Sequence, residues 1–546
     1  YLTLNREFEA STVKALEKIY NNGHLKKGFK PVNWCVKIQS ALAEAEVEYK
    51  EKESTAIDVK FKITSSNSLE KIFGIKNLSA ETFIVIWTTT PWTLPSNRSV
   101  AIKKDLIYVL VSDGKENYII TENLLEKFKE RTKLNLKKLS ECNGEKLISL
   151  EAKHPFLNAK INIIHSNHVT DDSGTGCVHI APAHGLEDFE LGKKYNLEVI
   201  NPIQSNGVFS GLPKELNGIH VYKLDEHVIN ILTKEKRLLS ENKFKHSYPH
   251  CWRTKTPLIY RATPQWFVSM HKNNLLEKTL NKLPDVNWMP SWGEARIQGM
   301  LSDRPDWCIS RQRKWGVPIT MLINKKTGEP HSNSSIIFSR VVKLVEEYGI
   351  EKWFDIKIEE LIDNPEDYEK VTDTLDVWFD SGSSHAAVLE KNHDLEFPAD
   401  LYLEGSDQHR GWFQSSLLTS VAISDSVPYK TAMTHGFTVD AKGNKMSKSK
   451  GNVIAPQKII DRFGSDILRL WVASTDSSSE MNVSEEILNR TSDKYRKIRN
   501  TIRFLLSNIS DYDNEKFSHE AVTVELDKWI IKKAVETQKE VQRHYE

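Results

Sequence analysis

Cysteine is scarce in this chain, and its five positions are far apart. Cys35, Cys142, Cys177, Cys251 and Cys308 form no C-x-x-C pair among the 546 residues. A local zinc knuckle uses such closely spaced ligands, so the sequence gives it no support and we expect no metal site in this chain. The same spacing predicts buried, reduced thiols in a cytoplasmic protein.

The sequence also lacks long apolar runs, and its formal net charge is close to zero. No run reaches the roughly 20 residues that span a bilayer, which predicts a protein without a membrane segment. Lys and Arg number 75 against 74 Asp and Glu, a formal net charge of +1, which argues against a nonspecific nucleic-acid coat but permits a local basic patch. The hydrophobic fraction of 39% over this length predicts several well-packed domains.

A strand-to-helix junction stands out near residue 404. The apolar run 401–403 predicts a buried parallel strand, and Glu404 and Gly405 follow it directly. A helical pattern begins at Gly411. In open α/β sheets ligands bind beyond the carboxyl ends of strands, where helix N-termini favour anions, so this junction is a candidate binding site.

A doubly cationic loop follows a second predicted strand at 430–439. Turn residues occupy 440–444, and Lys445-Met446-Ser447-Lys448-Ser449 comes next. A lone pair of lysines is usually solvated surface. Beside the preceding junction, the small and mobile loop indicates a site that binds ATP and stabilises the leaving pyrophosphate.

With these segments in place, the chain resembles class I aminoacyl-tRNA synthetases of the isoleucyl branch. The resemblance rests on the KMSKS sequence at 445–449, Asp-Val-Trp-Phe-Asp-Ser-Gly-Ser at 376–383, the segment 404–413 and Trp-Thr-Thr-Thr-Pro-Trp-Thr-Leu-Pro-Ser-Asn at 87–97. Valyl relatives carry a Thr-Thr-Arg-Pro-Glu type of sequence where this chain has Thr89-Thr90-Pro91-Trp92, and leucyl relatives carry Thr-Arg-Pro-Asp.

The resemblance implies an α/β fold. We expect the second half of a Rossmann-like parallel-sheet catalytic domain, an inserted β-barrel-like editing domain and the start of an α-helical bundle. The expected boundaries are a catalytic segment at 1–50, the insert at 51–240, the catalytic domain with the KMSKS loop at 241–475, and a stem with the start of the anticodon-binding domain at 476–546.

Local patterns agree with this division. Residues 1–50 are expected to be mainly helical, and alternation at 58–63 predicts the first strand of a β-rich region. Asp113-Gly114 predicts a hairpin turn. The basic amphipathic pattern from Leu488 to Leu506 predicts a long helix.

One motif of the family is missing. Its members carry H-x-G-H near the start of the nucleotide-binding fold, and none of the 18 histidines here falls in that pattern. We therefore expect a fragment that lacks the H-x-G-H region and most of the C-terminal tRNA-binding region.

The resemblance assigns roles at the synthetic site. Lys445 and Lys448 would stabilise the phosphates of ATP, which is expected to bring Mg²⁺, while Ser447 and Ser449 keep the loop small and mobile so that it can close over the nucleotide. The expected adenylate-binding residues are Glu404 for the aminoacyl-adenylate, Gly405, Asp407 and Gln408 at the adenosine end, and Trp378 and Trp412 as walls of the side-chain pocket. The basic segment 310–319 is expected to contact the tRNA acceptor end.

A second site is expected in the insert. One methylene is worth only about 1–3 kcal/mol, and isoleucyl enzymes are the standard illustration of this limit, so mischarged valine must be removed by hydrolysis. The expected editing residues are Thr88, Thr89 and Thr90, whose hydroxyls bind the adenosine and position water, Asn97 beyond them, His179, which contacts the terminal ribose, and Asp188, which anchors the substrate ammonium. Alone, the threonines would indicate β propensity and Asp188 an N-cap.

The expected activity is ATP-dependent attachment of isoleucine to tRNA(Ile) with editing of valyl-tRNA(Ile), by a monomer. Zinc is expected only in a region beyond this chain. Three alternatives remain: a valine-specific relative, a stand-alone hydrolase of mischarged tRNA with a vestigial ligase site, and a non-catalytic tRNA-binding protein.

Overall fold

The computed structural model describes residues 1–64, 66–76, 78, 80–148, 150–447, 451–513 and 522–545. The chain divides into two compact units, residues 1–433 and 434–546, which are described separately. In the described part of the chain, no helix combines the length and apolarity that crossing a membrane requires. All five cysteines are buried and unpaired with one another.

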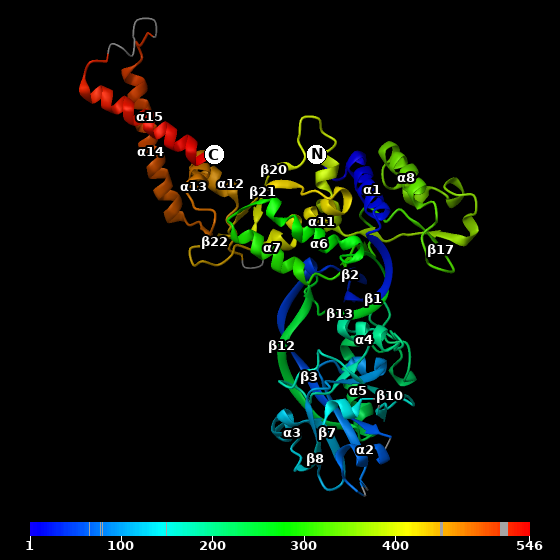
Figure 1. Ribbon diagram of the computed structural model, residues 1–546. Helices are drawn as coiled ribbons and strands as arrows, with labels where there is room; N and C mark the ends of the chain where they lie inside the picture. Colours follow the sequence, from blue (N-terminus) through cyan, green and yellow to red (C-terminus); the bar gives the residue numbers. More distant parts are fainter. Residues whose placement is uncertain are drawn as a thin grey trace. The chain divides into compact units, whose positions relative to one another are not determined.

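A four-stranded sheet lies in the middle of the first unit, between the part that carries α1 and α11 and the insert (Figure 1). Its order is β15 (Trp307–Cys308), β13 (Ile259–Val268), β1 (Leu25–Cys35) and β2 (Ser40–Leu42). The prediction of a mainly helical start is confirmed for α1 (Arg6–Asn21) and wrong beyond it. Ten residues of β1 pair antiparallel with β13, more than 220 positions away, and this long-range pairing overrides the local pattern.

The insert is built on a ten-stranded mixed sheet. Its path runs in the order β11 (Val178–Ile180), β5 (Ser99–Ile102), β10 (Lys160–His165), β9 (Glu151–Lys153), β3 (Val47–Ile63), β4 (Thr82–Thr88), β7 (Asn117–Thr121), β6 (Ile107–Ser112) and β8 (Lys137–Asn143), with β12 (Leu238–Cys251) on β3. The β3–β12 pair forms the long ribbon of Figure 1. Pairing of the described strands does not close between β11 and β8, so the barrel-like form is not confirmed.

Helices pack around this sheet. They are α2 (Ser66–Phe73), α3 (Leu125–Thr132), α4 (Leu186–Lys194) and α5 (Val221–Lys234). The hairpin predicted at Asp113-Gly114 is confirmed between β6 and β7, and Gly114 adopts a φ of 90° there, a conformation that glycine accepts without strain.

The alternation at 58–63 does not produce a half-exposed strand. Asp58 and Lys60 are buried with their apolar neighbours, because each has a partner from another element. Arg131 donates two hydrogen bonds to Asp58 at 2.6 and 2.7 Å, and Lys60 pairs with Glu116. Buried charges are tolerated in this way only when they are paired.

The rest of the first unit carries the expected catalytic half. A three-stranded sheet has the order β14 (Asn287–Met289), β21 (Tyr429–His435) and β20 (Ala399–Gly405), with β14 and β21 parallel. Two small pairs are β16 (Ser310–Arg311) with β19 (Thr374–Leu375) and β17 (Leu322–Asn324) with β18 (Tyr368–Lys370). The helices are α6 (Leu275–Asn281), α7 (Trp292–Ser302), α8 (Ser334–Tyr348), α9 (Lys352–Asp355), α10 (Val377–Gly382) and α11 (Trp412–Ser424).

The prediction of a buried strand at 401–403 is only partly correct. The strand exists as β20, but Leu401 and Leu403 are each 49% exposed. Side chains alternate between the two faces of a strand, so Leu401 and Leu403 share one face of β20, and that face is exposed. Tyr402 points the other way and is buried against Trp412 and Tyr429.

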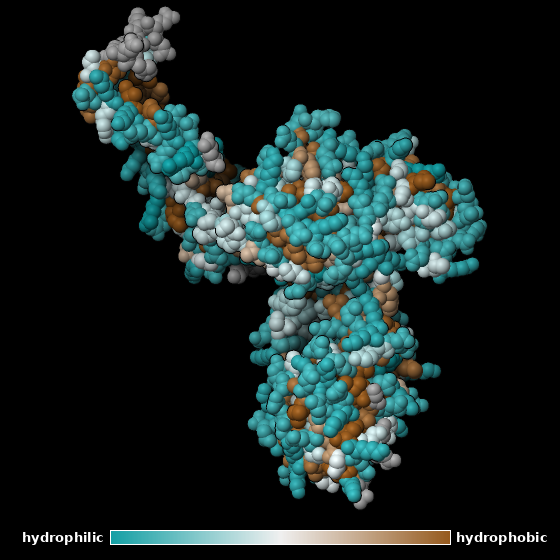
Figure 2. Space-filling view, in the orientation of Figure 1, coloured by the Kyte–Doolittle hydropathy of each residue, from teal (hydrophilic) through white to brown (hydrophobic). Residues whose placement is uncertain are grey.

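The second unit is small and mostly helical. It contains β22 (Thr438–Val439), β23 (Met481–Asn482), α12 (Pro456–Phe463), α13 (Ser465–Ala473), α14 (Glu485–Asn508) and α15 (Glu525–Tyr545). Helix α14 confirms the predicted basic helix. Apolar side chains remain exposed on α14 and α15, and brown patches mark them in Figure 2.

Candidate functional site

Ligand pockets usually enclose about 300–1,000 Å³, and the insert carries a cavity of about 620 Å³. Thr88, Thr89, Thr90, His179 and Asp188 all line it. They come from three elements: the end of β4 and the turn after it, β11, and the first turn of α4. The structure therefore brings together five of the six residues predicted for editing.

The threonines form a hydroxyl network at the end of β4. The Thr88 and Thr90 hydroxyls lie 3.2 Å apart, and the amide of Thr90 donates to Thr88 Oγ1 at 3.1 Å. Thr93 Oγ1, on the 3₁₀ helix η2 (Pro91–Ser96), donates to the carbonyl of Thr90 at 2.9 Å. Hydroxyls held in this way can both donate to and accept from a ligand or a water molecule.

His179 is held from behind by two buried side chains. Its Nε2 lies 3.1 Å from Thr93 Oγ1, and its Nδ1 lies 3.5 Å from Asn97 Nδ2. Asn97 is fully buried and supports His179 rather than lining the cavity. Burial lowers the pKa of His179 to about 4, so its ring is neutral at pH 7.

Asp188 presents the carboxylate of the cavity. One oxygen, Oδ2, accepts the amide of Ala181 at 2.9 Å. Burial has the largest effect on the pKa of Asp188 and raises it to about 7. The hydrogen bond from Ala181 lowers this pKa and the charge of Glu187 raises it, each by less than burial does. Burial therefore disfavours the ionised form of this carboxylate. A cation that enters the cavity stabilises the ionised form, so the site is suited to binding one.

His184 and Tyr260 are among the cavity residues that were not predicted, and Thr93 behind His179 was also missed. His184 Nε2 lies 3.1 Å from Ser96 Oγ and its Nδ1 lies 2.9 Å from the carbonyl of Tyr260 on β13. Burial lowers the pKa of His184 to about 4. His184 lies five residues after His179 and could have been found from that proximity, whereas Tyr260 is some 170 positions from Thr88 and gave no local signal.

The residues predicted for adenylate binding gather around the end of β20. Glu404 and Gly405 end the strand, and Asp407 and Gln408 lie on the 3₁₀ helix η11 (Ser406–Arg410). Asp407 is exposed, while Gln408 is partly buried and its Oε1 accepts the amide of Trp412 at 2.9 Å. Gln408 therefore fixes the start of α11.

Trp378 and Trp412 are both partly buried near Gly411. A Cβ on Gly411 would lie 2.8 Å from Trp378 Cη2 and 2.2 Å from Gln408 Oε1, so only glycine fits between them. Trp412 stacks on Tyr402 with ring centroids 3.9 Å apart, and its Nε1 donates to the carbonyl of Ser381 at 2.9 Å. The two indoles are thus held rigidly.

The lysine loop belongs to the second unit. Lys445 is exposed, with its Nζ 3.4 Å from the centroid of the Phe437 ring. The amide of Ser447 donates to Asn452 Oδ1 at 3.0 Å, which shapes the start of the loop. Lys448 and Ser449 lie outside the described residues.

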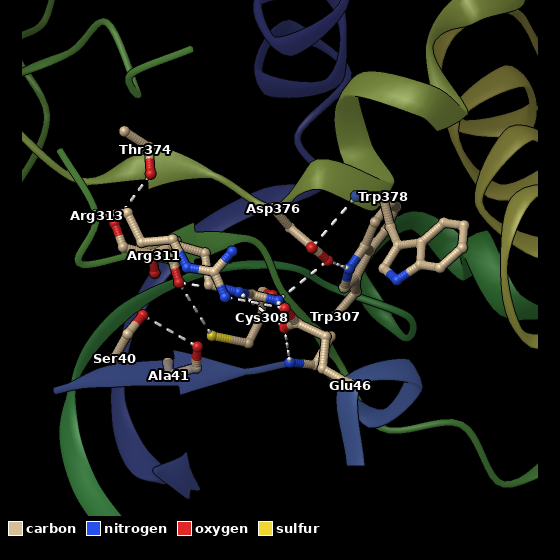
Figure 3. Close-up of polar contacts among 12 residues, drawn as sticks. Ser40, Ala41, Glu46, Trp307, Cys308, Arg311, Arg313, Thr374, Asp376 and Trp378 are labelled. Atoms are coloured by element: carbon tan, nitrogen blue, oxygen red, sulfur yellow. Dashed lines mark hydrogen bonds and ion pairs between the residues drawn. The ribbon is translucent and has the colours of Figure 1, made fainter. Parts of the chain in front are cut away.

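The expectation that segment 310–319 contacts tRNA is wrong for Arg311. Its side chain is fully buried and its guanidinium is paired with Glu46 and Asp376, as Figure 3 shows. A buried, paired guanidinium cannot reach a tRNA backbone.

Within the described ranges, no group of three or more His, Cys, Asp or Glu side chains could hold a metal ion.

Curated proteins that are similar to this chain include isoleucine–tRNA ligases. An isoleucine–tRNA ligase of Francisella philomiragia subsp. philomiragia is 52% identical over 548 residues, covering 100% of this chain and 59% of that protein. An isoleucine–tRNA ligase of Francisella tularensis subsp. mediasiatica is 51% identical over 551 residues, with the same coverage. The chain thus spans 59% of the length of these curated relatives.

A LeuRS from Agrobacterium radiobacter K84, solved in a ternary complex with tRNA and LeuAMS, aligns with 16% identity and a TM-score of 0.43 over 97% of this chain and 64% of that one. The family model described as tRNA synthetases class I (I, L, M and V) matches residues 1–484. Because that match covers most of the sequence, this chain belongs to the class I tRNA synthetases of the isoleucine, leucine, methionine and valine group.

Proposed function

We propose that this chain is the larger part of an isoleucine–tRNA ligase that activates isoleucine with ATP, transfers it to tRNA(Ile) and hydrolyses valyl-tRNA(Ile). The supporting observation is the cavity that gathers Thr88, Thr89, Thr90, His179 and Asp188. The names of the relatives at 52% and 51% identity support the substrate. The proposed setting is a cytoplasmic monomer with the domain boundaries expected from the sequence.

The residues suggest a division of labour in editing. The carboxylate of Asp188 holds the α-ammonium of the misattached amino acid, and His179 contacts the terminal ribose. The hydroxyls at 88–90 position the adenosine and the attacking water. Water adds to the ester carbonyl, the ester bond to the ribose oxygen breaks, and that oxygen receives a proton as the free amino acid leaves.

In the synthetic reaction the carboxylate of isoleucine attacks the α-phosphorus of ATP. Glu404 contacts the aminoacyl-adenylate, Gly405, Asp407 and Gln408 line its adenosine end, and Trp378 and Trp412 wall the side-chain pocket. Lys445 and Lys448, with Ser447 and Ser449, stabilise the departing pyrophosphate. Alignment of the reactants supplies much of the rate.

The decisive assay is release of valine from valyl-tRNA(Ile) by this chain, with isoleucyl-tRNA(Ile) as the matched substrate. We expect valine to be released and isoleucine to be retained. Faster release of isoleucine than valine would favour the valine-specific alternative, and no hydrolysis of either would contradict the editing proposal. Isoleucine-dependent exchange between ATP and pyrophosphate separates a ligase from a stand-alone hydrolase.

The pKa of Asp188 predicts how editing depends on pH. Below pH 7 its carboxylate is protonated and cannot pair with the substrate ammonium. A pKa of about 7 implies that kcat/KM for valyl-tRNA(Ile) falls about tenfold from pH 8 to pH 6, since kcat/KM reports the free enzyme. Initial rates, corrected for spontaneous ester hydrolysis, measure this, and a flat profile would contradict the role of Asp188.

A further inference from the structure

Three buried charged side chains and one that is 24% exposed, that of Arg313, form a cluster in the first unit (Figure 3). Arg311 Nη2 lies 3.0 Å from Glu46 Oε2 and 3.1 Å from Asp376 Oδ2, and Arg313 Nη2 lies 3.1 Å from Glu46 Oε1. Arg311, Glu46 and Asp376 are at most 2% exposed. Two carboxylates and two guanidiniums balance in charge, and we call this set the Arg311 cluster.

Glu46 joins the cluster to the base of the insert. It ends the 3₁₀ helix η1 (Glu44–Glu46) and directly precedes β3, the long strand of the ribbon. Its carbonyl accepts the amide of Trp252, the residue that follows β12, at 3.0 Å. Both strands of the ribbon are therefore anchored beside this carboxylate.

Asp376 joins the cluster to the proposed amino-acid pocket. Its Oδ1 accepts the amide of Trp378 at 3.3 Å and so caps α10. Its Oδ2 accepts Trp307 Nε1 at 2.9 Å, and its own amide donates to the carbonyl of Ile309 at 2.7 Å. The position of this carboxylate sets where the helix carrying Trp378 begins.

Stability alone does not account for such a cluster. Taking charges out of water is costly, and well-packed apolar residues often replace buried ion pairs without loss of stability. A guanidinium offers something that apolar residues lack, which is several donors in one rigid plane. In Arg311, Nε donates to Glu46 Oε2 at 3.1 Å, and Nη1 donates to the carbonyls of Cys308 and Ser310 at 2.8 and 2.9 Å. Its Nη2 forms ion pairs with both carboxylates and makes no hydrogen bond of its own.

We propose that Arg311 is a positioning residue that couples the base of the insert to the amino-acid pocket by bridging Glu46 and Asp376. A displacement at Glu46 then moves Asp376, the start of α10 and Trp378. The part of this inference that concerns amino-acid binding rests on the proposed function. The coupling between Glu46 and Trp378 does not, because it can be measured without any substrate.

The coupling is tested by fluorine NMR of the chain carrying 5-fluorotryptophan. Trp378 is one of 14 tryptophans, and its resonance is the one that Trp378→Phe removes. We expect Glu46→Gln to shift this resonance by more than a line width in the otherwise wild-type chain. In an Arg311→Lys background the same change should cause no further shift, because lysine keeps the charge but cannot join two carboxylates.

Asp58→Asn is the matched control, because it disturbs another fully buried carboxylate that is paired with an arginine, within the sheet of the insert. It should leave the resonance of Trp378 in place. An equal shift from Glu46→Gln with and without Arg311, no shift in either, or a shift from Asp58→Asn would overturn the proposal.

A second readout is binding of an isoleucyl sulfamoyl adenosine, a stable mimic of the adenylate. We expect Arg311→Lys and Glu46→Gln each to weaken binding about threefold or more, with no further loss in the double variant, and Asp58→Asn to bind as wild type. Additive losses would overturn the proposal. A wild-type chain that does not bind the mimic counts against the proposed ligase site, and the resonance of Trp378 still decides on Arg311.

Discussion

Asp188→Asn is expected to lower kcat/KM for hydrolysis of valyl-tRNA(Ile) by at least about 30-fold, because losing one partner of a buried charge pair costs about 2–5 kcal/mol. The amide keeps the shape of the side chain and can still accept the amide of Ala181. It cannot neutralise the ammonium of the substrate. Initial rates of valine release measure the loss.

The same substitution should stabilise the folded chain. The pKa of Asp188 rises from the usual 3.8 to about 7 on folding. Folding therefore favours the protonated acid, and this contribution to stability is lost as pH rises through 7. Three pKa units correspond to about 4 kcal/mol at full burial, and because the residue is only partly buried we expect a gain of about 1–2 kcal/mol at pH 8.

Denaturation midpoints of Asp188→Asn and wild type, measured at pH 8 and below pH 4, check this prediction. The stabilisation by the variant should disappear below pH 4, because there Asp188 is protonated in both the folded and the unfolded wild-type chain. Asp172→Asn is the control, since Asp172 is exposed on the same insert and does not line the cavity. An Asp188→Asn variant that edits normally, or that is less stable at pH 8, would contradict the role and burial assigned to this carboxylate.

Gly411→Ala is expected to weaken binding of the isoleucyl sulfamoyl adenosine at least tenfold. The new Cβ would lie 2.2 Å from Gln408 Oε1 and 2.8 Å from Trp378 Cη2, distances that force both side chains to move. Overpacking of this kind costs about 1–3 kcal/mol. The displaced Gln408 would also stop accepting the amide of Trp412, so both indoles would shift.

Gly299→Ala supplies the control for that change. Gly299 lies in α7, and a Cβ there meets nothing within 4 Å. Alanine in a helix interior is favoured over glycine by about 0.5–1 kcal/mol, so this variant should bind the mimic unchanged and be slightly more stable. Calorimetric titration compares the two, and equal affinity in Gly411→Ala and wild type would remove Trp378 and Gln408 from the amino-acid site.

Much of the candidate site could be predicted because it lies where the chain changes direction. Glu404 and Gly405 do end a strand, and the threonines at 88–90 do end another, as the pattern of apolar runs and turns indicates. The hairpin at Asp113-Gly114 and the basic helix α14 are equally local in origin. In each case the deciding contacts lie within a few residues.

The missed features depend on contacts between distant residues. Strand β1 forms because β13 pairs with it, and Thr93 and Tyr260 matter because they approach His179 and His184. The sequence around β1, His179 and His184 carries no pattern that indicates these partners.

The sequence by itself determined the family resemblance, the strand ends that carry the polar motifs and the local turns, because short-range propensity and motif spacing encode them. Only the tertiary structure decided which charges are buried. Asp58 and Arg311 look like surface residues in the sequence, and both are fully enclosed. A charge can be buried only where a partner offsets its lost hydration, and the partners Arg131, Glu46 and Asp376 arrive from positions 65 to 265 residues away.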